Sequence, residues 1–261
     1  MSAERGLRLE LADVGRRFGG VAAIRDVSLS IPEGQITGII GPNGAGKTTL
    51  FNLVTGSLRP TSGRILLNGR RIDGRDPGDI SRLGLVRSFQ SPSILPGLSV
   101  ADHLRCAVLC QSVGRPRRLL ADMLKRSTRC DTGAVVDEIL EFAGLGAYAD
   151  QEAGALAYGL QKTLGLAAAL AASPKLLLAD EPAAGLNGAE TRRMEELLRA
   201  IRDKRGVSLV VIEHDVPLMM RLCERIIVLA EGSVIVDGPP GSIRHAPAFI
   251  DAYLGPASHA T

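Results

Sequence analysis

Aromatic residues are scarce in this sequence: there is no tryptophan, and aromatic side chains make up only 3% of the 261 residues. This scarcity disfavours the aromatic platforms that stack nucleic-acid bases and the aromatic-lined sites that bind sugars. Excess charge is scarce as well, since 31 Lys and Arg residues and 28 Asp and Glu residues leave a formal net charge of +3. An excess this small does not imply a nucleic-acid partner, and we expect none.

Long hydrophobic runs and metal-binding cysteine patterns are also missing. No uncharged stretch reaches the roughly 18–20 residues of a membrane span, and residues 1–6 lack the apolar core of a signal peptide. We therefore expect the protein in the cytoplasm or on the cytoplasmic face of a membrane. The cysteines form no CxxC pair and lack a histidine at ligand spacing, so reduced thiols are expected at Cys106, Cys110, Cys130 and Cys223.

The order of apolar runs and turns is typical of an α/β protein with a parallel sheet. Continuous apolar runs of the length expected for buried strands occupy residues 35–40, 176–179 and 208–212. A helix is expected after the first run, over residues 48–55. Residues 190–205 have helical periodicity and lie between the other two runs.

Two parts of the chain depart from this pattern. Residues 7–11 and 26–31 alternate apolar and polar side chains, which predicts an antiparallel β subdomain at the N-terminus. From about residue 100 to 145 the strand signals vanish, and we expect a helical subdomain inserted into the α/β core. A basic patch lies within it, and both a solvated helix surface and a contact with lipid headgroups or a membrane partner remain open for Arg115, Arg117, Arg118, Lys125, Arg126 and Arg129.

Residues 41–48 match the phosphate-binding loop pattern GxxxxGK[ST] in full, between a predicted strand and a predicted helix. Glycines in such a loop let backbone N–H groups turn toward phosphates, and the positive end of the helix dipole adds to the attraction. We expect Lys47 to reach the β- and γ-phosphates of a nucleotide and the Thr48 hydroxyl to ligate Mg²⁺. The complete match in this context argues against a chance glycine-rich turn.

Two other predicted strands end in groups suited to the same chemistry. One ends in Asp180 and Glu181, and it would deliver Asp180 to the Mg²⁺ opposite Thr48 while Glu181 polarises a water for attack on the γ-phosphate. The other leads to His214, which is placed to sense the γ-phosphate, although a histidine at a strand end often serves only as a polar cap. An acidic strand end is weak evidence alone, but it becomes strong beside Lys47.

With these motifs the chain resembles the ATP-binding cassette (ABC) family over nearly its whole length. Gln90 resembles the family's Q-loop glutamine, residues 156–161 stand where the LSGGQ signature belongs, and residues 184–187 are similar to the D-loop. His214 matches the switch histidine. Phe18 matches the aromatic residue under the adenine, with a core aromatic as the alternative. Within the family, the chain looks most like ATP-binding subunits of branched-chain amino-acid importers, over residues 17–21, 157–159, 180–187 and 252–255.

The resemblance implies an α/β fold of the P-loop NTPase (ABC ATPase) type, with one domain over residues 7–255 and a helical subdomain at about 100–165. It implies catalytic or γ-phosphate-sensing roles for Glu181, His214, Gln90 and Lys47, and Mg²⁺ contacts for Thr48, Asp180 and Gln90. The implied nucleotide-binding residues are Gly41, Pro42, Asn43, Gly44, Ala45, Gly46, Lys47, Thr48, Thr49, Phe18, Ala157, Tyr158 and Gly159.

The resemblance also implies partners. Because the chain has one phosphate loop and one signature, ATP would lie between it and a second ABC ATPase subunit, identical or related. Two separate transmembrane permease subunits would form the pore, with a solute-binding protein acting indirectly, and the chain would sit peripherally on the cytoplasmic face of the inner membrane. The alternatives are a lipid or lipopolysaccharide exporter, a regulatory cassette with little turnover, and a clamp in DNA repair or translation, for which a second cassette or coiled coil is missing.

The signature departs from the family pattern. Ala157 replaces its serine, Leu160 replaces a polar residue, and residues 163–169 lack the Arg and Glu that relatives place there. One lost hydrogen bond to a charged phosphate costs about 1.5–3 kcal/mol. Our hypothesis is that this signature is weakened, while the phosphate loop, Asp180, Glu181 and His214 are intact.

Overall fold

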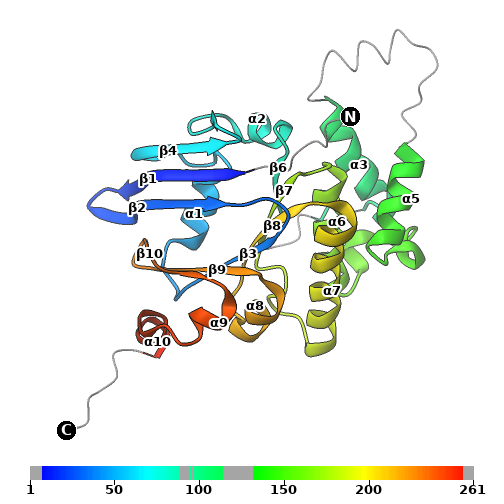
Figure 1. The fold of residues 1–261 in the computed structure, drawn as a ribbon. Coiled ribbons are helices and arrows are strands. Elements are labelled where there is room, and N and C mark those ends of the chain that lie inside the picture. The colour runs from blue at the N-terminus through cyan, green and yellow to red at the C-terminus, as the bar shows by residue number, and fades with distance from the viewer. Residues whose placement is uncertain (1–7, 89–93, 96, 114–131, 255–261) are drawn as a thin grey trace, which may run out of the picture.

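A computed structural model of the chain describes residues 8–88, 94–95, 97–113 and 132–254, and all structural statements concern this part. It contains two β-sheets with helices packed around them (Figure 1). Gln90, Cys130 and the basic patch of residues 115–129 lie outside the described residues. No described helix is both long and apolar enough to cross a membrane.

The antiparallel sheet has the order β2-β1-β4-β5. Its strands are β1 (Leu9–Phe18), β2 (Val21–Ile31), β4 (Ser62–Leu67) and β5 (Arg70–Arg71). The register between β1 and β2 shifts between Leu11 and Val14, where Asp13 has a φ of 52°. Such a bulge bends the strand and increases its local twist. The antiparallel N-terminal subdomain expected from the sequence is confirmed.

The second sheet has the order β10-β9-β3-β8-β7-β6 and positions the chemistry. All its neighbouring strands are parallel except β10, which pairs antiparallel with β9. Its strands are β3 (Ile36–Ile40), β6 (Leu85–Ser88), β7 (Leu176–Asp180), β8 (Ser208–Ile212), β9 (Arg225–Ala230) and β10 (Ser233–Gly238). Every residue of β3, β7 and β8 is buried, which explains their continuous apolar sequences, because helices or the other sheet cover both faces.

Helices fill the spaces around these sheets. They are α1 (Lys47–Val54), α2 (Pro77–Arg82), α3 (Val100–Val113), α5 (Thr132–Phe142), α6 (Tyr158–Ala171), α7 (Gly188–Arg205), α8 (Val216–Leu222), α9 (Pro240–Ile243) and α10 (Pro247–Leu254), with short 3₁₀ turns at Gly146–Tyr148 and Ala153–Ala155. Helix α7 begins with a capping box: the Asn187 side chain accepts from backbone N–H groups of the first turn, and the Glu190 side chain accepts from the Asn187 N–H.

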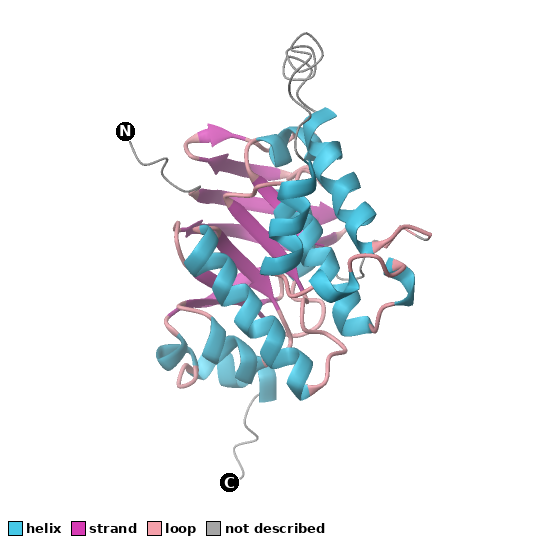
Figure 2. Ribbon diagram, turned by 90° about the vertical axis from the view of Figure 1, so that its right-hand side faces the viewer, coloured by secondary structure: helices cyan, strands magenta, loops and turns pink. Residues whose placement is uncertain are grey.

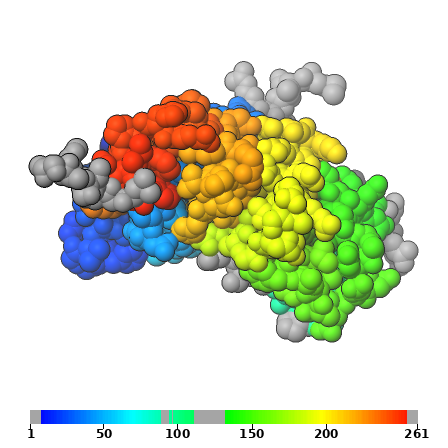
Figure 3. All heavy atoms as spheres, turned by 90° about the horizontal axis from the view of Figure 1, so that it is seen from below, coloured from blue at the N-terminus to red at the C-terminus, as the bar shows by residue number. Residues whose placement is uncertain are grey.

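Three buried clusters hold these layers together. The first joins α1 and the antiparallel sheet to one face of the six-stranded sheet, and Phe51 is the largest fully buried side chain in it. The second joins α6, α7 and α8 to the other face, where Figure 2 shows helices in cyan lying over the magenta strands. The third joins α3, α5 and α6. Figure 3 places the N-terminal sheet (blue) and these middle helices (green) at opposite ends of the molecule.

Candidate functional site

The phosphate loop runs from the end of β3 to the start of α1, at the carboxyl edge of the parallel strands. Gly44 and Gly46 have φ values of 80° and 101°, which side-chain-bearing residues rarely adopt. At Gly41 a Cβ atom would lie 2.0 Å from the Leu229 carbonyl oxygen, so only glycine lets the loop approach β9 this closely. The glycines of the motif therefore set the shape of the loop as well as its phosphate-binding capacity.

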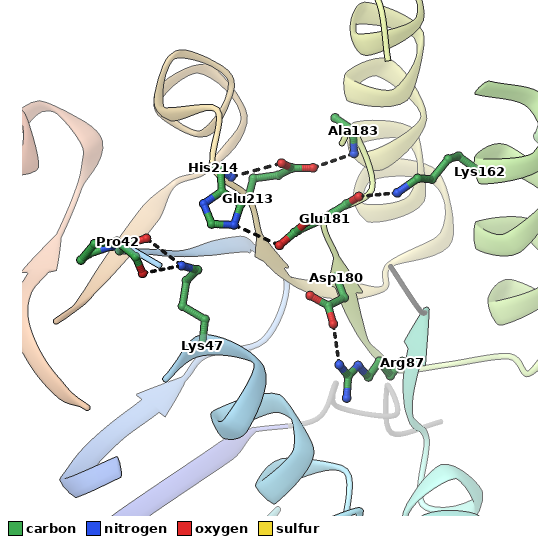
Figure 4. A network of polar contacts seen from close by, with 10 residues as sticks. Pro42, Lys47, Arg87, Lys162, Asp180, Glu181, Ala183, Glu213 and His214 are labelled. Carbon is green, nitrogen blue, oxygen red and sulfur yellow. Dashed lines mark hydrogen bonds and ion pairs between the residues drawn. The ribbon is translucent and has the colours of Figure 1, made fainter. Parts of the chain in front are cut away.

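Lys47 is the first residue of α1, and its side chain folds back over the loop (Figure 4). Its Nζ donates to the carbonyl oxygens of Gly41 at 2.6 Å and Pro42 at 3.0 Å. Burial lowers the pKa of Lys47, while the nearby charges of Glu181 and Asp180 act in the opposite direction. Its ammonium group thus lies at the loop with two backbone acceptors that a phosphate would replace.

The ends of β7 and β8 bring the acidic and imidazole groups together. Asp180 and Ile212 are paired across the two strands, so Glu181 and His214 follow at the same edge of the sheet. His214 Nε2 lies 3.0 Å from Glu181 Oε1. Glu181 has a φ of 47°, in the left-handed region, so its backbone is strained at this functional position.

Asp180 is almost completely buried and forms an ion pair. Its Oδ2 lies 2.5 Å from Arg87 Nη2, with the two side chains 4% and 10% exposed. Arg87 stands on β6, beside β7, and its Nη1 also donates to Asn52 Oδ1 at 2.6 Å. The sequence analysis did not single out Arg87.

Lys47, Glu181 and His214 line one pocket of about 240 Å³, whereas the Asp180–Arg87 ion pair is not part of its lining. Its lining brings the phosphate loop together with both strand-end groups predicted to act on the γ-phosphate. The lining residues are Ala23, Asn43, Gly44, Ala45, Gly46, Lys47, Thr48, Thr49, Glu181 and His214. The described part of the chain thus gathers predicted residues from three motifs that are distant in sequence around a single site.

Residues 157–159 do not line this pocket. Ala157 is the N-cap of α6 and has no polar side chain to cap it, and Tyr158 is exposed. A Cβ at Gly159 would lie 2.7 Å from Glu190 Oε1, so any larger residue here would displace the Glu190 side chain at the start of α7. The signature turn is therefore packed against the D-loop side of its own chain and away from its own phosphate loop.

Phe18, at the end of β1, is 45% exposed. The alternative of a core aromatic is therefore wrong. The guanidinium carbon of Arg16 lies 4.6 Å from the centre of the Phe18 ring, in a cation–π arrangement. The start of β2, which pairs with the Phe18 end of β1, reaches the loop, because Ala23 lines the pocket. A stacking role for Phe18 under a base stays a prediction.

Two buried charged residues complete the site and were not predicted to have a role. Lys162 on α6 donates from Nζ to the Glu181 carbonyl oxygen at 2.7 Å. Glu213 at the end of β8 accepts from the Ala183 N–H at 2.6 Å. Both contacts involve the segment of residues 181–183, and Figure 4 shows Lys162 on the side of Glu181 opposite Lys47. A signal was present in the sequence for Lys162, because helical spacing puts it on the buried face of α6 with Gly159 and Leu166.

The oxygen donors predicted to bind Mg²⁺ differ in position. The Thr48 residue lines the pocket, whereas the Asp180 carboxylate does not and is paired with Arg87. Both are hard oxygen donors, and Mg²⁺ in such sites is bound by one or two protein oxygens together with phosphates and water. Among the described residues there is no cluster of three or more His, Cys, Asp or Glu side chains that could hold a metal by protein ligands alone. This donor set suits an ion that arrives with a nucleotide.

Comparison with known proteins agrees with this geometry. The family described as ABC transporter matches residues 24–184. The chain is 38% identical over 253 residues to the high-affinity branched-chain amino acid transport ATP-binding protein BraF of Pseudomonas aeruginosa, covering 95% of this chain and 98% of BraF. It is 38% identical over 245 residues to LivG of Escherichia coli K12, described in the same words, covering 92% and 95%. A nucleotide-free ATP-binding cassette from an ABC transporter superposes with a TM-score of 0.82 at 28% identity, covering 96% of this chain and 100% of that chain.

Proposed function

Because the chain belongs to the ABC transporter family, we propose that it is the ATP-hydrolysing subunit of an importer for branched-chain amino acids or related small solutes. The observation that carries the hydrolytic part is the single pocket lined by Lys47, Glu181 and His214. The solute class rests on the relatives named above, branched-chain amino acid transport ATP-binding proteins that match over nearly their full length. Those relatives favour import over the export of lipid or lipopolysaccharide.

The residues around the pocket divide the work of hydrolysis. Lys47 exchanges its two backbone acceptors for the β- and γ-phosphate oxygens of ATP. Glu181 accepts a proton from the attacking water and orients it, while His214, hydrogen-bonded to Glu181, contacts the γ-phosphate. Thr48 and Asp180 would hold Mg²⁺, which neutralises charge on the β- and γ-phosphates when bound. Gln90, outside the described residues, keeps its expected role near the metal and water, and Phe18 stacks under the adenine.

A second cassette, identical or related, completes the site. This proposal is supported by the position of residues 157–159, which lie at the start of α6 and away from the pocket of their own chain. The uncapped N–H groups of that helix start suit the γ-phosphate bound by another cassette. One chain therefore offers half of each of two composite sites.

The remaining partners and the domain limits are part of the same proposal. One ABC ATPase domain covers residues 7–255, with the helical subdomain at about 100–165 carrying the signature. Two separate permease subunits form the pore, a solute-binding protein delivers the solute, and the chain lies peripherally on the cytoplasmic face of the membrane. Nucleic acid is not a partner.

The first test is Mg²⁺-dependent ATP hydrolysis by the purified chain, beside its Glu181→Gln variant. Hydrolysis that the variant abolishes supports the proposal, shows that two copies of this chain form a working site, and contradicts the weakened-signature hypothesis. ATP binding without turnover means that a different cassette completes the site. Equal hydrolysis by both proteins contradicts the role of Glu181. Uptake of labelled leucine by proteoliposomes containing the assembled transporter then tests the solute class.

A further inference from the structure

Lys162 and Glu213 are two oppositely charged side chains buried behind the catalytic edge of the sheet. Their exposed fractions are 5% and 2%, although charged side chains are seldom buried so completely. They come from different elements, α6 and the end of β8, and neither lines the pocket. Burying such groups is unfavourable unless they are paired and hydrogen-bonded, so their contacts call for an explanation.

Both residues hold the short segment that begins with Glu181. Lys162 Nζ donates to the Glu181 carbonyl oxygen at 2.7 Å, and Glu213 Oε1 accepts from the Ala183 N–H at 2.6 Å. The segment is also a turn, because the Ala184 N–H donates to the same Glu181 carbonyl oxygen at 3.2 Å. A cation thus holds one end of the turn and a carboxylate holds the other (Figure 4).

The two charges compensate each other across this turn. Burial lowers the pKa of Lys162, and the negative charge of Glu213 raises it. Burial raises the pKa of Glu213, while its hydrogen bonds from the Ala183 and His214 N–H groups and the positive charge of Lys162 lower it. The pair therefore supports the charged state of both members in a buried place.

Glu181 needs such support because its backbone is held in an unfavourable conformation. Its φ of 47° is one that L-residues with side chains seldom adopt. Its N–H is fixed to the Ile212 carbonyl oxygen at 2.9 Å, so the strand side of the residue is already anchored. The carbonyl side is anchored by Lys162, and the Glu181 carboxylate lies against His214.

We propose that Lys162 and Glu213 are positioning residues that clamp the turn of residues 181–183 and so hold the Glu181 carboxylate in the geometry needed for hydrolysis. This inference rests on the proposed role of Glu181. Lys162 lies one turn beyond Gly159 on α6, so the clamp also links the helix that carries the signature to the catalytic carboxylate of the same chain. If α6 shifts when the second cassette binds, the Lys162 side chain would transmit that movement to the Glu181 backbone.

The test compares Lys162→Met and Lys162→Arg with Lys204→Met, an exposed lysine on α7 that serves as the matched control. Lys162→Met removes the donor to the Glu181 carbonyl oxygen, and Lys162→Arg keeps a cationic donor. We expect Lys162→Met to lower kcat for ATP by about 10- to 100-fold, the scale of an ångström-sized misplacement of a catalytic group. The Kd for ATP should stay within about twofold, because Lys162 does not line the pocket, and Lys162→Arg should recover part of kcat.

Hydrogen exchange gives a readout that does not require hydrolysis. The Ala183 N–H should exchange faster in Glu213→Ala, and the Ala184 N–H faster in Lys162→Met, with both unchanged in Lys204→Met. The double variant Lys162→Met/Glu213→Gln removes both charges together and leaves neither uncompensated, so it tests the idea even if a single variant does not fold. Its effect on kcat should be smaller than the product of the effects of Lys162→Met and Glu213→Gln measured singly, because both act on one turn.

Three results would overturn the clamp: unchanged exchange of both amides, an unchanged kcat in folded Lys162→Met, or a loss of kcat matched by the same loss of ATP affinity. An effect of the double variant equal to the product of the two single effects would overturn it as well. Failure of the proposed function looks different. If wild-type protein and Glu181→Gln hydrolyse ATP equally, the role of Glu181 is refuted, while the exchange data still decide whether the turn is clamped.

Discussion

Replacing Arg87 with glutamine should destabilise the protein far more than its position outside the pocket suggests. The Arg87 guanidinium lies 2.5 Å from Asp180, and the two side chains are 10% and 4% exposed. Loss of the arginine leaves a buried carboxylate without its partner, and removing one member of a buried ion pair costs about 3–5 kcal/mol. At roughly 2–4 °C of melting temperature per kcal/mol for a chain of this size, we expect a decrease of about 6–20 °C.

Arg82→Gln is the matched control. Arg82 pairs with Asp79 three residues earlier on α2, but these side chains are 47% and 44% exposed. Exposed pairs contribute about 0–1 kcal/mol, so its melting temperature should fall by no more than about 4 °C. Both variants lose one positive charge, so the difference between their melting temperatures measures the effect of burying the ion pair.

Thermal unfolding followed by circular dichroism, in EDTA and without nucleotide, measures both variants under conditions where no divalent ion replaces the arginine. The double variant Arg87→Gln/Asp180→Asn removes both charges, and it should regain part of the lost stability. Equal melting temperatures for Arg87→Gln and Arg82→Gln would refute the reasoning, because burial would then add nothing to the cost.

Two further predictions concern the helical region. Burial lowers the pKa of His103, so the unfolded chain takes up its proton first, near pH 6.5, and the folded protein loses stability as the pH falls below that value. His103→Asn keeps an acceptor for the Leu95 N–H and should show a smaller fall in melting temperature between about pH 7.5 and 5; an equal fall would exclude His103 as the cause. If the signature is weakened, Leu160→Gln in the assembled transporter should raise the ATPase rate. An unchanged rate would contradict the weakened-signature hypothesis.

The strands that carry the site were predictable because they are buried on both faces. Such strands need apolar side chains at nearly every position, which gives the runs that end at Ile40, Ala179 and Ile212. The phosphate loop was predictable for a related reason. Its glycines are demanded by positive φ angles and by a close approach to β9, so the pattern is fixed by local geometry.

The N-terminal strand was predicted too short. Alternation over residues 7–11 indicated a strand there, but β1 continues to Phe18. The register shifts between Leu11 and Val14 and again between Val14 and Arg16, which breaks the alternation that sequence analysis relies on. The position of Phe18 on an exposed strand end was therefore not readable from periodicity.

The buried charges were the hardest part to predict. Charged residues usually lie at the surface, and Lys162 and Glu213 are buried, and Arg87 is mostly buried, where partners from other elements contact them. Leu160 shows the opposite case. It stands where relatives have a polar residue, and it is partly buried against the cluster formed by α3, α5 and α6, so its apolar character also has a packing role.

The separation of the pocket from residues 157–159 of the same chain has a consequence for mass action. If each nucleotide makes its full set of contacts only between two cassettes, the apparent affinity for ATP depends on the fraction of cassettes that are dimeric. For free chains in dilute solution, that dependence makes nucleotide affinity rise with protein concentration. Permease subunits that hold two cassettes side by side would make their association intramolecular, so a fixed effective concentration would take the place of the protein concentration. The membrane assembly would then set the ATP level at which the cassettes respond, without a single added contact to the nucleotide.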